Sequence, residues 1–445
     1  MHRLIIHQLG PIKHCELECS SFMTLTGFQA SGKSTIAKAV YYFRTIKEDI
    51  IELAVRQTLN KNWIVGLEDS DYPETVKDLK DGLKRYLVKK YRNTFGLVKG
   101  REHGTYLEYY FTETCFVKFI LSPDMEVPVP NECQIIFSDE LSDFLQKKND
   151  CFSITPLGVP EKEKKQLYAE LYQLFDDSCM VVYIPAGRSM ITLLSQQFNY
   201  IYATMDDSQR GSLDSCTRDY IERTLRLKGE FSDGLYGLTP VFPEKYDLPS
   251  ESVRQAVNLI KAVLRGDYRC SNGEEQIILT DGKYVKLNYA SSGQQECVWI
   301  LNLLYYYLLQ QKQVLFIIEE PEAHLFPESQ KYITELIALV NRCGHSIILT
   351  THSPYVLGTL NNLLYACTIP KQYQKKASEI IHKSLWIDFH CFASWFVKNG
   401  TIENCMDEEI HMIQNEKIDE ISKVINDDFE RLLDLQITNE DGANV

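Results

Sequence analysis

Residues 27–35, Gly27-Phe28-Gln29-Ala30-Ser31-Gly32-Lys33-Ser34-Thr35, follow the pattern G-x-x-x-x-G-K-[ST]. The preceding residues 21–26 are typical of a short buried strand, and residues 35–42 contain helix formers without glycine or proline. Strand, glycine loop and helix in this order predict a phosphate-binding loop, because loop N–H groups and the helix N-terminus would face phosphate oxygens. Lys33 would reach the β- and γ-phosphates, and Ser34 would offer a hydroxyl to Mg²⁺. The flanking elements disfavour the alternative, a flexible loop before an ordinary helix.

The composition is that of a globular protein and excludes several classes. Of 445 residues, 44% are hydrophobic and 24% are charged, which is ordinary for a folded domain. No apolar run approaches a bilayer-spanning length, and the N-terminus is too short and too alternating for a signal peptide, so we expect a cytoplasmic protein without membrane partners. Thirteen cysteines without a C-x-x-C pair indicate reduced thiols and disfavour zinc. The net charge of −14 argues against broad nucleic-acid coating, although a local basic groove is compatible with it.

A pass along the chain predicts strands and helices but no internal repeat. Residues 2–9 and 14–19 alternate like a hairpin, and residues 105–121 resemble two further strands. Residues 181–184 are typical of a buried strand. No sustained heptads occur, so a long coiled coil is not expected. We expect four segments: 1–59, the N-terminal part of a core with the phosphate loop; 60–270, a helical and mixed insertion offering a partner or assembly surface; 271–369, the C-terminal part of the core; and 370–445, a small helical segment.

Paired acids follow a second buried strand. Val314 to Ile318 are apolar and lead directly into Glu319 and Glu320. One such acid can hold Mg²⁺ through its water shell, while the next orients or deprotonates an attacking water. A further apolar strand ends at His352, which could hydrogen-bond a γ-phosphate. Each feature alone is weak evidence, since acids often follow such strands and a single histidine is usually structural.

Residues 289–296, Tyr-Ala-Ser-Ser-Gly-Gln-Gln-Glu, precede an apolar helix at 298–309. Small residues before a helix N-terminus can form an anion-binding nest. The alternative is a serine-rich helix cap with Glu296 in the first turn. Taken in isolation, this segment favours the cap.

The order of these motifs resembles that of ABC-type ATPases, most closely the branch of SMC, RecF and OLD proteins. The matching segments are GFQASGKST, ASSGQQE, IIEEPEAHLFP and TTHSP, and the resemblance covers residues 1–45 and 285–365. The segment YIPAGRS at 183–189 is similar to one in bacterial anti-phage defence ATPases, such as those of PARIS and Septu systems. The resemblance implies an α/β fold: an ABC-type core with a mixed β-sheet, a P-loop, a helical or mixed insertion and a small helical C-terminal segment.

The resemblance also implies roles for individual residues. Glu320 and His352 would be catalytic, and Ser34 with Glu319 would hold Mg²⁺. Ser291 and Gly293 would form a signature that contacts ATP bound to the opposite subunit. The nucleotide would be bound by Gly27, Ser31, Gly32, Lys33, Ser34, Thr35, Ser291 and Gly293.

The sequence departs from the family pattern at two positions. Ala290 replaces the usual leucine of the signature, and Glu319 replaces the usual aspartate, whose shorter side chain would set a different metal distance. The glutamine of the family's Q-loop has no clear counterpart, and Gln196 and Gln197 are candidates for it.

The implied mechanism is an ATP sandwich, in which two subunits packed head to tail bind nucleotides between them. About 80 residues follow the last matching strand, less than a domain such as the TOPRIM nuclease of OLD proteins, so a separate effector, a nuclease or toxin, is expected. One hypothesis is a sensor or regulator in anti-phage defence, responding to a phage-derived trigger. The alternative is a RecF-like DNA-repair ATPase acting on DNA ends or gaps. A purely structural nucleotide-binding module would leave Glu320 and His352 without a purpose.

Overall fold

The structure, a computed structural model, describes most of the chain. The described residues are 2–61, 78–96, 104–121, 133–149, 151–152, 159–193, 200, 204–205, 213–238, 250–310, 312–414 and 424–432. Within these ranges, no helix combines the length and the apolar character needed to cross a bilayer.

The central layer is a six-stranded sheet in the order β14-β13-β3-β12-β11-β7. Its strands are β3 (Phe22–Gly27), β7 (Met180–Ile184), β11 (Val314–Glu319), β12 (Ser346–Thr350), β13 (Phe392–Lys398) and β14 (Thr401–Asn404). Neighbours from β13 to β7 run parallel, whereas β14 is antiparallel to β13. Every residue of β3 and β11 is buried, as expected for strands covered on both faces. The carboxyl ends of β3, β12, β11 and β7 therefore meet at one edge of the sheet.

A second, antiparallel sheet has the order β2-β1-β4-β5-β6. Its strands are β1 (Arg3–Leu9), β2 (Ile12–Glu18), β4 (Thr105–Tyr110), β5 (Phe116–Leu121) and β6 (Cys133–Phe137). The hairpin expected from residues 2–9 and 14–19 is confirmed, and so are the two strands within 105–121; β6 was not foreseen. Buried and more exposed positions alternate along β5, so one face of this sheet packs inward.

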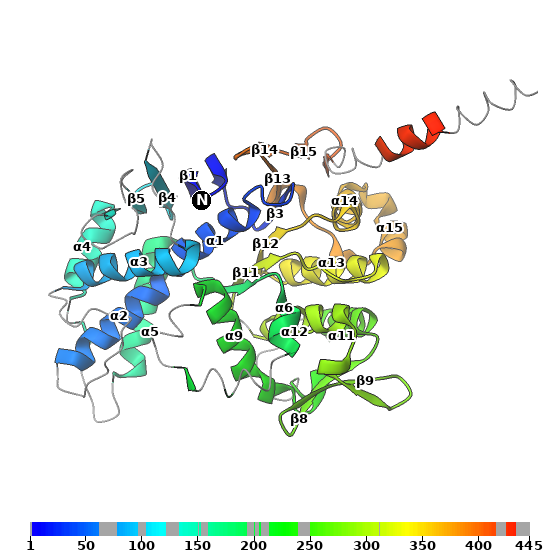
Figure 1. Ribbon diagram of the computed structural model, residues 1–445, viewed down its shortest axis with the longest axis horizontal. Helices are drawn as coiled ribbons and strands as arrows, with labels where there is room; N and C mark the ends of the chain where they lie inside the picture. The colour runs from blue at the N-terminus through cyan, green and yellow to red at the C-terminus, as the bar shows by residue number, and fades with distance from the viewer. Residues whose placement is uncertain are drawn as a thin grey trace, which may run out of the picture.

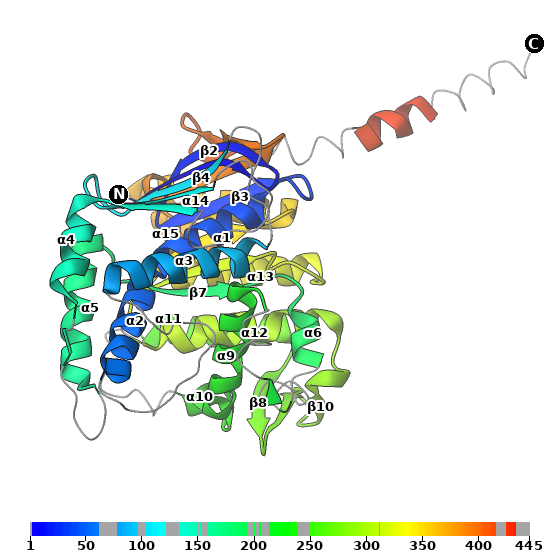
Figure 2. The same ribbon diagram turned by 60° about the vertical axis from the view of Figure 1, so that its left-hand side comes forward.

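Two hydrophobic cores lie on opposite faces of the central sheet, because alternate residues of a strand point to opposite faces. Leu315 and Ile317 of β11 belong to a core shared with the antiparallel sheet, whereas Phe316 and Ile318 belong to a core shared with α11–α14. Figure 2 shows α1 and the antiparallel sheet on one side of the central strands and α11 and α12 on the other. The first core includes residues of α1 (Lys33–Arg44), α2 (Ile46–Lys61), α3 (Leu79–Phe95), α4 (Asp139–Lys147) and α5 (Glu161–Phe175). The second includes residues of α11 (Ser250–Leu264), α12 (Ser292–Leu308), α13 (Pro327–Arg342) and α14 (Pro354–Thr368).

Smaller elements complete the described chain (Figure 1). A three-stranded sheet in the order β10-β9-β8 precedes α12. The remaining strands are β8 (Asp267–Ser271), β9 (Glu274–Ile278), β10 (Tyr284–Lys286), β15 (Met406–Asp407) and β16 (Met412–Ile413). The remaining helices are α6 (Arg188–Leu193), α9 (Ser215–Leu227), α10 (Gly234–Gly237) and α15 (Gln374–Ile380). Turns of 3₁₀-helix occupy Lys228–Phe231, Leu287–Tyr289, Lys371–Tyr373, Lys383–Leu385 and Phe389–Cys391.

The C-terminal segment 370–445 differs from the helical segment that the sequence predicts. It contains α15 and a helical stretch at 424–432, but β13 and β14 join the central sheet. β13 pairs with β3 in parallel, and Thr24 Oγ1 donates to Ser394 Oγ at 2.8 Å between the two strands. The physical reason is that Phe392–Lys398, rich in aromatic residues, completes a sheet edge that would otherwise leave β3 without a neighbour on that side.

The region 60–270 is likewise not a separate layer. Residues 105–137 supply three strands of the antiparallel sheet, and residues 180–184 supply β7 of the central sheet. Helices α3–α5 pack on the same core as α1. Position 60 therefore does not coincide with a break in either sheet.

Candidate functional site

The phosphate loop connects β3 to α1. At two of its positions, the surrounding atoms leave room only for glycine. Gly27 has φ +140°, and a Cβ there would lie 2.3 Å from the carbonyl oxygen of Val397 in β13. Gly32 has φ +111°, and its Cβ would lie 2.4 Å from Cδ1 of Ile12 in β2. The loop is thus enclosed between the N-terminal hairpin and the C-terminal strand, and the glycines of the motif are required by both.

Lys33, the first residue of α1, is held inside this loop. Its side chain donates to the carbonyl oxygens of Gly27 at 3.1 Å and Phe28 at 2.8 Å. Burial lowers the pKa of Lys33 to about 8, although the nearby carboxylates Glu320, Glu322 and Glu319 oppose this shift. Phosphate oxygens would compete with the two carbonyls for the same ammonium group, as the loop's predicted role requires.

The two acids after β11 occupy different environments. Glu319 is buried; its Oε2 accepts from the Ala186 N–H at 3.1 Å, while Oε1 accepts no hydrogen bond within the described chain. The side chain of Glu320 is 41% exposed, and its backbone has φ +43°. A left-handed conformation costs a residue with a side chain about 1–3 kcal/mol. Thr350 helps to hold it, since its carbonyl oxygen accepts from Glu320 N at 3.0 Å.

His352 lies beside Glu320, with 3.6 Å between His352 Nε2 and Glu320 Oε1. Its position is fixed through Glu322, whose Oε1 accepts from the backbone N of His352 at 2.8 Å and from Thr351 Oγ1 at 2.6 Å. Burial and the charge of Lys33 lower the pKa of His352, so the imidazole is neutral at pH 7. A neutral imidazole can donate one hydrogen bond and accept another.

Ser291 and Gly293 lie at the start of α12, in a different cavity. Ser291 caps the helix: its Oγ accepts from Gln294 N at 3.3 Å, and Gln294 Oε1 accepts from Ser291 N at 3.1 Å. A Cβ on Gly293 would lie 2.7 Å from the carbonyl oxygen of His324. A cavity of about 510 Å³ opens here, and its lining comes from residues 263–265, 291–294 and 324–329, without the phosphate loop. The cap that residues 289–296 favoured in isolation is present, and Ser291 and Gly293 also border a cavity of their own.

The sequence pattern does not by itself indicate a role for Arg188, the first residue of α6 after β7. Arg188 is completely buried, and its guanidinium donates to the backbone carbonyls of Glu319 at 2.6 Å and Glu320 at 2.9 Å. The available indication was an arginine placed directly after a buried strand and Pro-Ala-Gly. The candidates for the Q-loop glutamine, Gln196 and Gln197, lie outside the described residues.

The comparisons with known proteins identify the family. A family model described as an AAA ATPase domain, AAA_15, matches residues 1–357. The chain belongs to this family. The AAA ATPase domain thus covers the phosphate loop, the two acids at the end of β11 and His352, and the protein is an ATP-hydrolysing enzyme with a mixed α/β core. No curated protein matches the chain.

Among solved structures, this AAA ATPase is similar to Smc head domains. One, from Pyrococcus furiosus, has an extended coiled coil and is bound to the C-terminal domain of ScpA; it is 10% identical, with 96% of this chain and 100% of that chain covered and a TM-score of 0.38. The SMC head domain from Thermotoga maritima is 13% identical; the match covers 90% of this chain and 97% of that chain, with a TM-score of 0.36. The Smc head domain with a coiled coil and joint from Pyrococcus yayanosii is 10% identical; the match covers 95% of this chain and 100% of that chain, with a TM-score of 0.40. Nothing about function rests on similarities this low.

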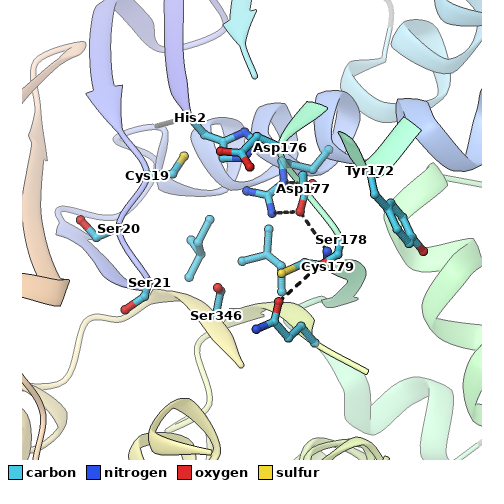
Figure 3. A pocket seen from close by; sticks show the side chains of 14 residues that line it. His2, Cys19, Ser20, Ser21, Tyr172, Asp176, Asp177, Ser178, Cys179 and Ser346 are labelled. Atoms are coloured by element: carbon cyan, nitrogen blue, oxygen red, sulfur yellow. Dashed lines mark hydrogen bonds and ion pairs between the residues drawn. The ribbon is translucent and has the colours of Figure 1, made fainter. Parts of the chain in front are cut away.

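A second pocket of this AAA ATPase, of about 480 Å³, lies at the amino end of the central sheet (Figure 3). Its lining includes Asp177, and Asp177 accepts from Arg44 Nη2 at 2.8 Å and from Lys47 Nζ at 2.7 Å. Burial raises the pKa of Asp177, but Arg44 and Lys47 more than offset this, so the pKa is lowered overall. Burial also raises the pKa of the Cys19 and Cys179 thiols. Two cations thus share a single carboxylate here, and Lys47 Nζ also donates to the backbone carbonyl oxygens of Asp177 and Cys179.

Proposed function

We propose that this ATPase is a switch assembled by ATP, in which two subunits packed head to tail regulate a separate effector in bacterial anti-phage defence. The observation that supports it best is the division of the expected ATP contacts between two places. Lys33, Glu320 and His352 converge at one edge of the central sheet, whereas Ser291 and Gly293 border another cavity. A single subunit would therefore hold ATP without the signature, and a second subunit would supply it.

In the proposed site, the loop would bind the phosphates, and Ser34 and Glu319 would hold Mg²⁺. The buried, unpartnered Oε1 of Glu319 and the exposed Ser34 hydroxyl are oxygen ligands of the kind that Mg²⁺ prefers. When bound, Mg²⁺ would neutralise charge on the β- and γ-phosphates. The phosphates themselves would be bound by Gly27, Ser31, Gly32, Lys33, Ser34 and Thr35.

Hydrolysis is assigned to Glu320 and His352. The exposed carboxylate of Glu320 accepts the proton of the attacking water, and the neutral imidazole of His352 hydrogen-bonds the γ-phosphate. Glu322 keeps the 351–352 backbone in place through its two hydrogen bonds. The left-handed backbone of Glu320 aims its side chain toward His352 rather than back along the sheet.

Assembly follows from the same division of residues. The N-terminus of α12 of one subunit approaches the γ-phosphate held by the other, so ATP connects the two subunits and hydrolysis releases them. Any ligand that binds the pair better than the single subunits then shifts the equilibrium by its difference in affinity.

The defence role rests on the segment 183–189, which is similar to one in defence ATPases. Ala186 and Arg188 of this segment contact the proposed metal ligand Glu319, and Arg188 also contacts the proposed catalytic acid Glu320. We propose that a phage product alters the assembled state and so releases a nuclease or toxin bound to the outer helices.

Assembly is tested with Ser291→Arg, which places a long cation at the start of α12. We expect ATP binding to each subunit to remain and hydrolysis to be lost. Ser232→Arg, at another exposed serine outside both cavities, is the matched control and should hydrolyse normally. The native mass of Glu320→Gln with and without ATP gives the companion measurement, and a monomer in both conditions contradicts the sandwich.

The defence role is tested by expressing the gene with its native neighbour and challenging the cells with a panel of phages. Protection that requires both genes and is lost in Lys33→Ala and Glu320→Gln supports the proposal. Absence of protection, combined with sensitivity to DNA damage on deletion, contradicts it and favours action on DNA ends or gaps.

A further inference from the structure

A buried arginine connects the acids after β11 with the beginning of α12. Besides its bonds to the carbonyls of Glu319 and Glu320, Arg188 donates through Nε to the carbonyl oxygen of Glu296 at 3.0 Å. Its Nη1 also donates to the carbonyl oxygen of Pro185. One guanidinium thus bonds to backbone carbonyls of three segments, the ends of β7 and β11 and the second turn of α12.

The side chain of Glu296 makes the reciprocal contacts. Its Oε1 accepts from Arg188 N at 3.0 Å, its Oε2 accepts from Ser189 N at 2.6 Å, and Arg188 Nη2 lies 3.2 Å from Oε1. Thr192 adds a further bond, from its Oγ1 to the carbonyl oxygen of Gln295 at 3.0 Å. Because Arg188 and Glu296 are both fully buried, water does not compete for these bonds.

This connection reaches a residue whose backbone conformation is unfavourable. The Glu320 carbonyl, held by Arg188, belongs to the residue in the left-handed region. At its other end the connection reaches α12 one turn beyond Gly293. The side chain of Arg188 thus bonds both to the second turn of α12 and to the backbone of Glu320.

We propose that Arg188 is a positioning residue that couples engagement of the α12 N-terminus to the orientation of the Glu320 carboxylate. This inference rests on the proposed function, since it takes Glu320 as the catalytic base and α12 as the trans-acting helix. It adds that hydrolysis requires both assembly and the contact between Arg188 and Glu296, whereas ATP binding requires neither. The geometry needs arginine, because its planar fork bonds to several carbonyls in fixed directions and a lysine ammonium does not.

The test compares wild type with Arg188→Lys and Glu296→Gln. Three quantities are measured: the Kd of a fluorescent ATP analogue, the mass in the presence of a non-hydrolysable ATP analogue, and kcat. For Arg188→Lys we expect Kd within about twofold and unchanged assembly, with kcat lowered on the order of 10²-fold, the usual loss for a small displacement of a catalytic group. Glu296→Gln should show the same pattern with a smaller loss, because an amide cannot accept both backbone N–H bonds.

Arg44→Lys is the matched control, since Arg44 is another buried, ion-paired arginine, but at the amino end of the sheet. We expect it to lower the unfolding temperature and to leave kcat unchanged. Should Arg188→Lys fail to fold, Glu296→Gln decides. A wild-type kcat in folded Arg188→Lys overturns the role of Arg188, and so does a wild-type kcat in Glu296→Gln if Arg188→Lys does not fold. The role is also overturned if a variant loses ATP affinity by the same factor as kcat. A wild type that hydrolyses ATP as a monomer overturns instead the proposed function.

Discussion

The two ends of the central sheet have the same types of charged residue, but these residues bind different partners at each end. At the amino end, both oxygens of Asp177 accept bonds from the cations Arg44 and Lys47. At the carboxyl end, the cations Lys33 and Arg188 donate mainly to backbone carbonyls. The acids at that end, Glu319 and Glu320, therefore keep carboxylate oxygens that no nearby cation neutralises fully.

This difference in charge pairing predicts that mutations at the two ends affect different properties of the protein. At the amino end, Arg44 and Lys47 share the carboxylate of Asp177, so loss of that carboxylate leaves two buried cations and costs stability. Buried or half-exposed acids that remain partly unpaired raise the energy of the free protein and gain partners when Mg²⁺ and phosphate bind. The amino end should thus respond to mutation in stability, and the carboxyl end in turnover.

The largest expected effect is on turnover at the carboxyl end. Glu320→Gln should reduce single-turnover hydrolysis on the order of 10³-fold and leave ATP bound, because an amide cannot take the proton of water. The measurement is quenched hydrolysis of radiolabelled ATP with enzyme in excess. Glu161→Gln, at an exposed acid on α5, should behave as wild type. Wild-type hydrolysis by Glu320→Gln would remove the catalytic assignment.

The next effect is on stability at the amino end. Asp177→Asn leaves Arg44 and Lys47 buried without a counter-charge and should lower the free energy of unfolding by about 3 kcal/mol. The ATP affinity of the folded molecules should not change, as urea titration and ATP binding would show. The exposed neighbour Asp176 is the control, since asparagine also tolerates its left-handed φ of +48°. Equal destabilisation by Asp176→Asn would contradict the account.

A smaller effect concerns pH at the carboxyl end. Phosphate binds the ammonium form of Lys33, whose pKa is about 8, so ATP affinity should be constant below pH 8. Above that pH the lysine must take up a proton on binding, and affinity should fall by up to about tenfold per pH unit. Lys33→Arg remains charged and should lose this dependence, whatever its affinity. Constant affinity of the wild type up to pH 9.5 would contradict the burial of Lys33.

The smallest effect is expected for the hydrogen bond that joins β3 and β13 between the two ends of the central sheet. Thr24→Val removes the bond from β3 to Ser394 of β13 and should cost about 1 kcal/mol of stability without changing kcat. Thr24→Ser keeps the hydroxyl that donates this bond and should lower the free energy of unfolding by less than Thr24→Val does. If chemical denaturation shows no difference between valine and serine, the pairing of β13 with β3 contributes little.

Local sequence patterns predicted the elements around the site but not the partners of their side chains. The glycine loop, the acids after β11 and the strand before His352 each have a pattern that short-range physics explains. β13 was missed because its pairing with β3 joins residues about 370 positions apart, and no local pattern encodes such a partner. Arg188 was missed for the same reason, since its bonds reach residues more than 100 positions away.

The sequence by itself determined the nucleotide chemistry, because the spacing of Gly27, Gly32 and Lys33 fixes how a loop can enclose phosphate. It also determined which strands are buried, since continuous apolar runs at 181–184 and 314–318 require cover on both faces. The tertiary structure alone decided which charges are paired. Arg44 closes on Asp177, whereas Arg188 binds carbonyls and Glu296 and leaves the carboxylate of Glu320 available beside His352. That outcome depends on distances between segments far apart in the chain, which the order of residues does not specify.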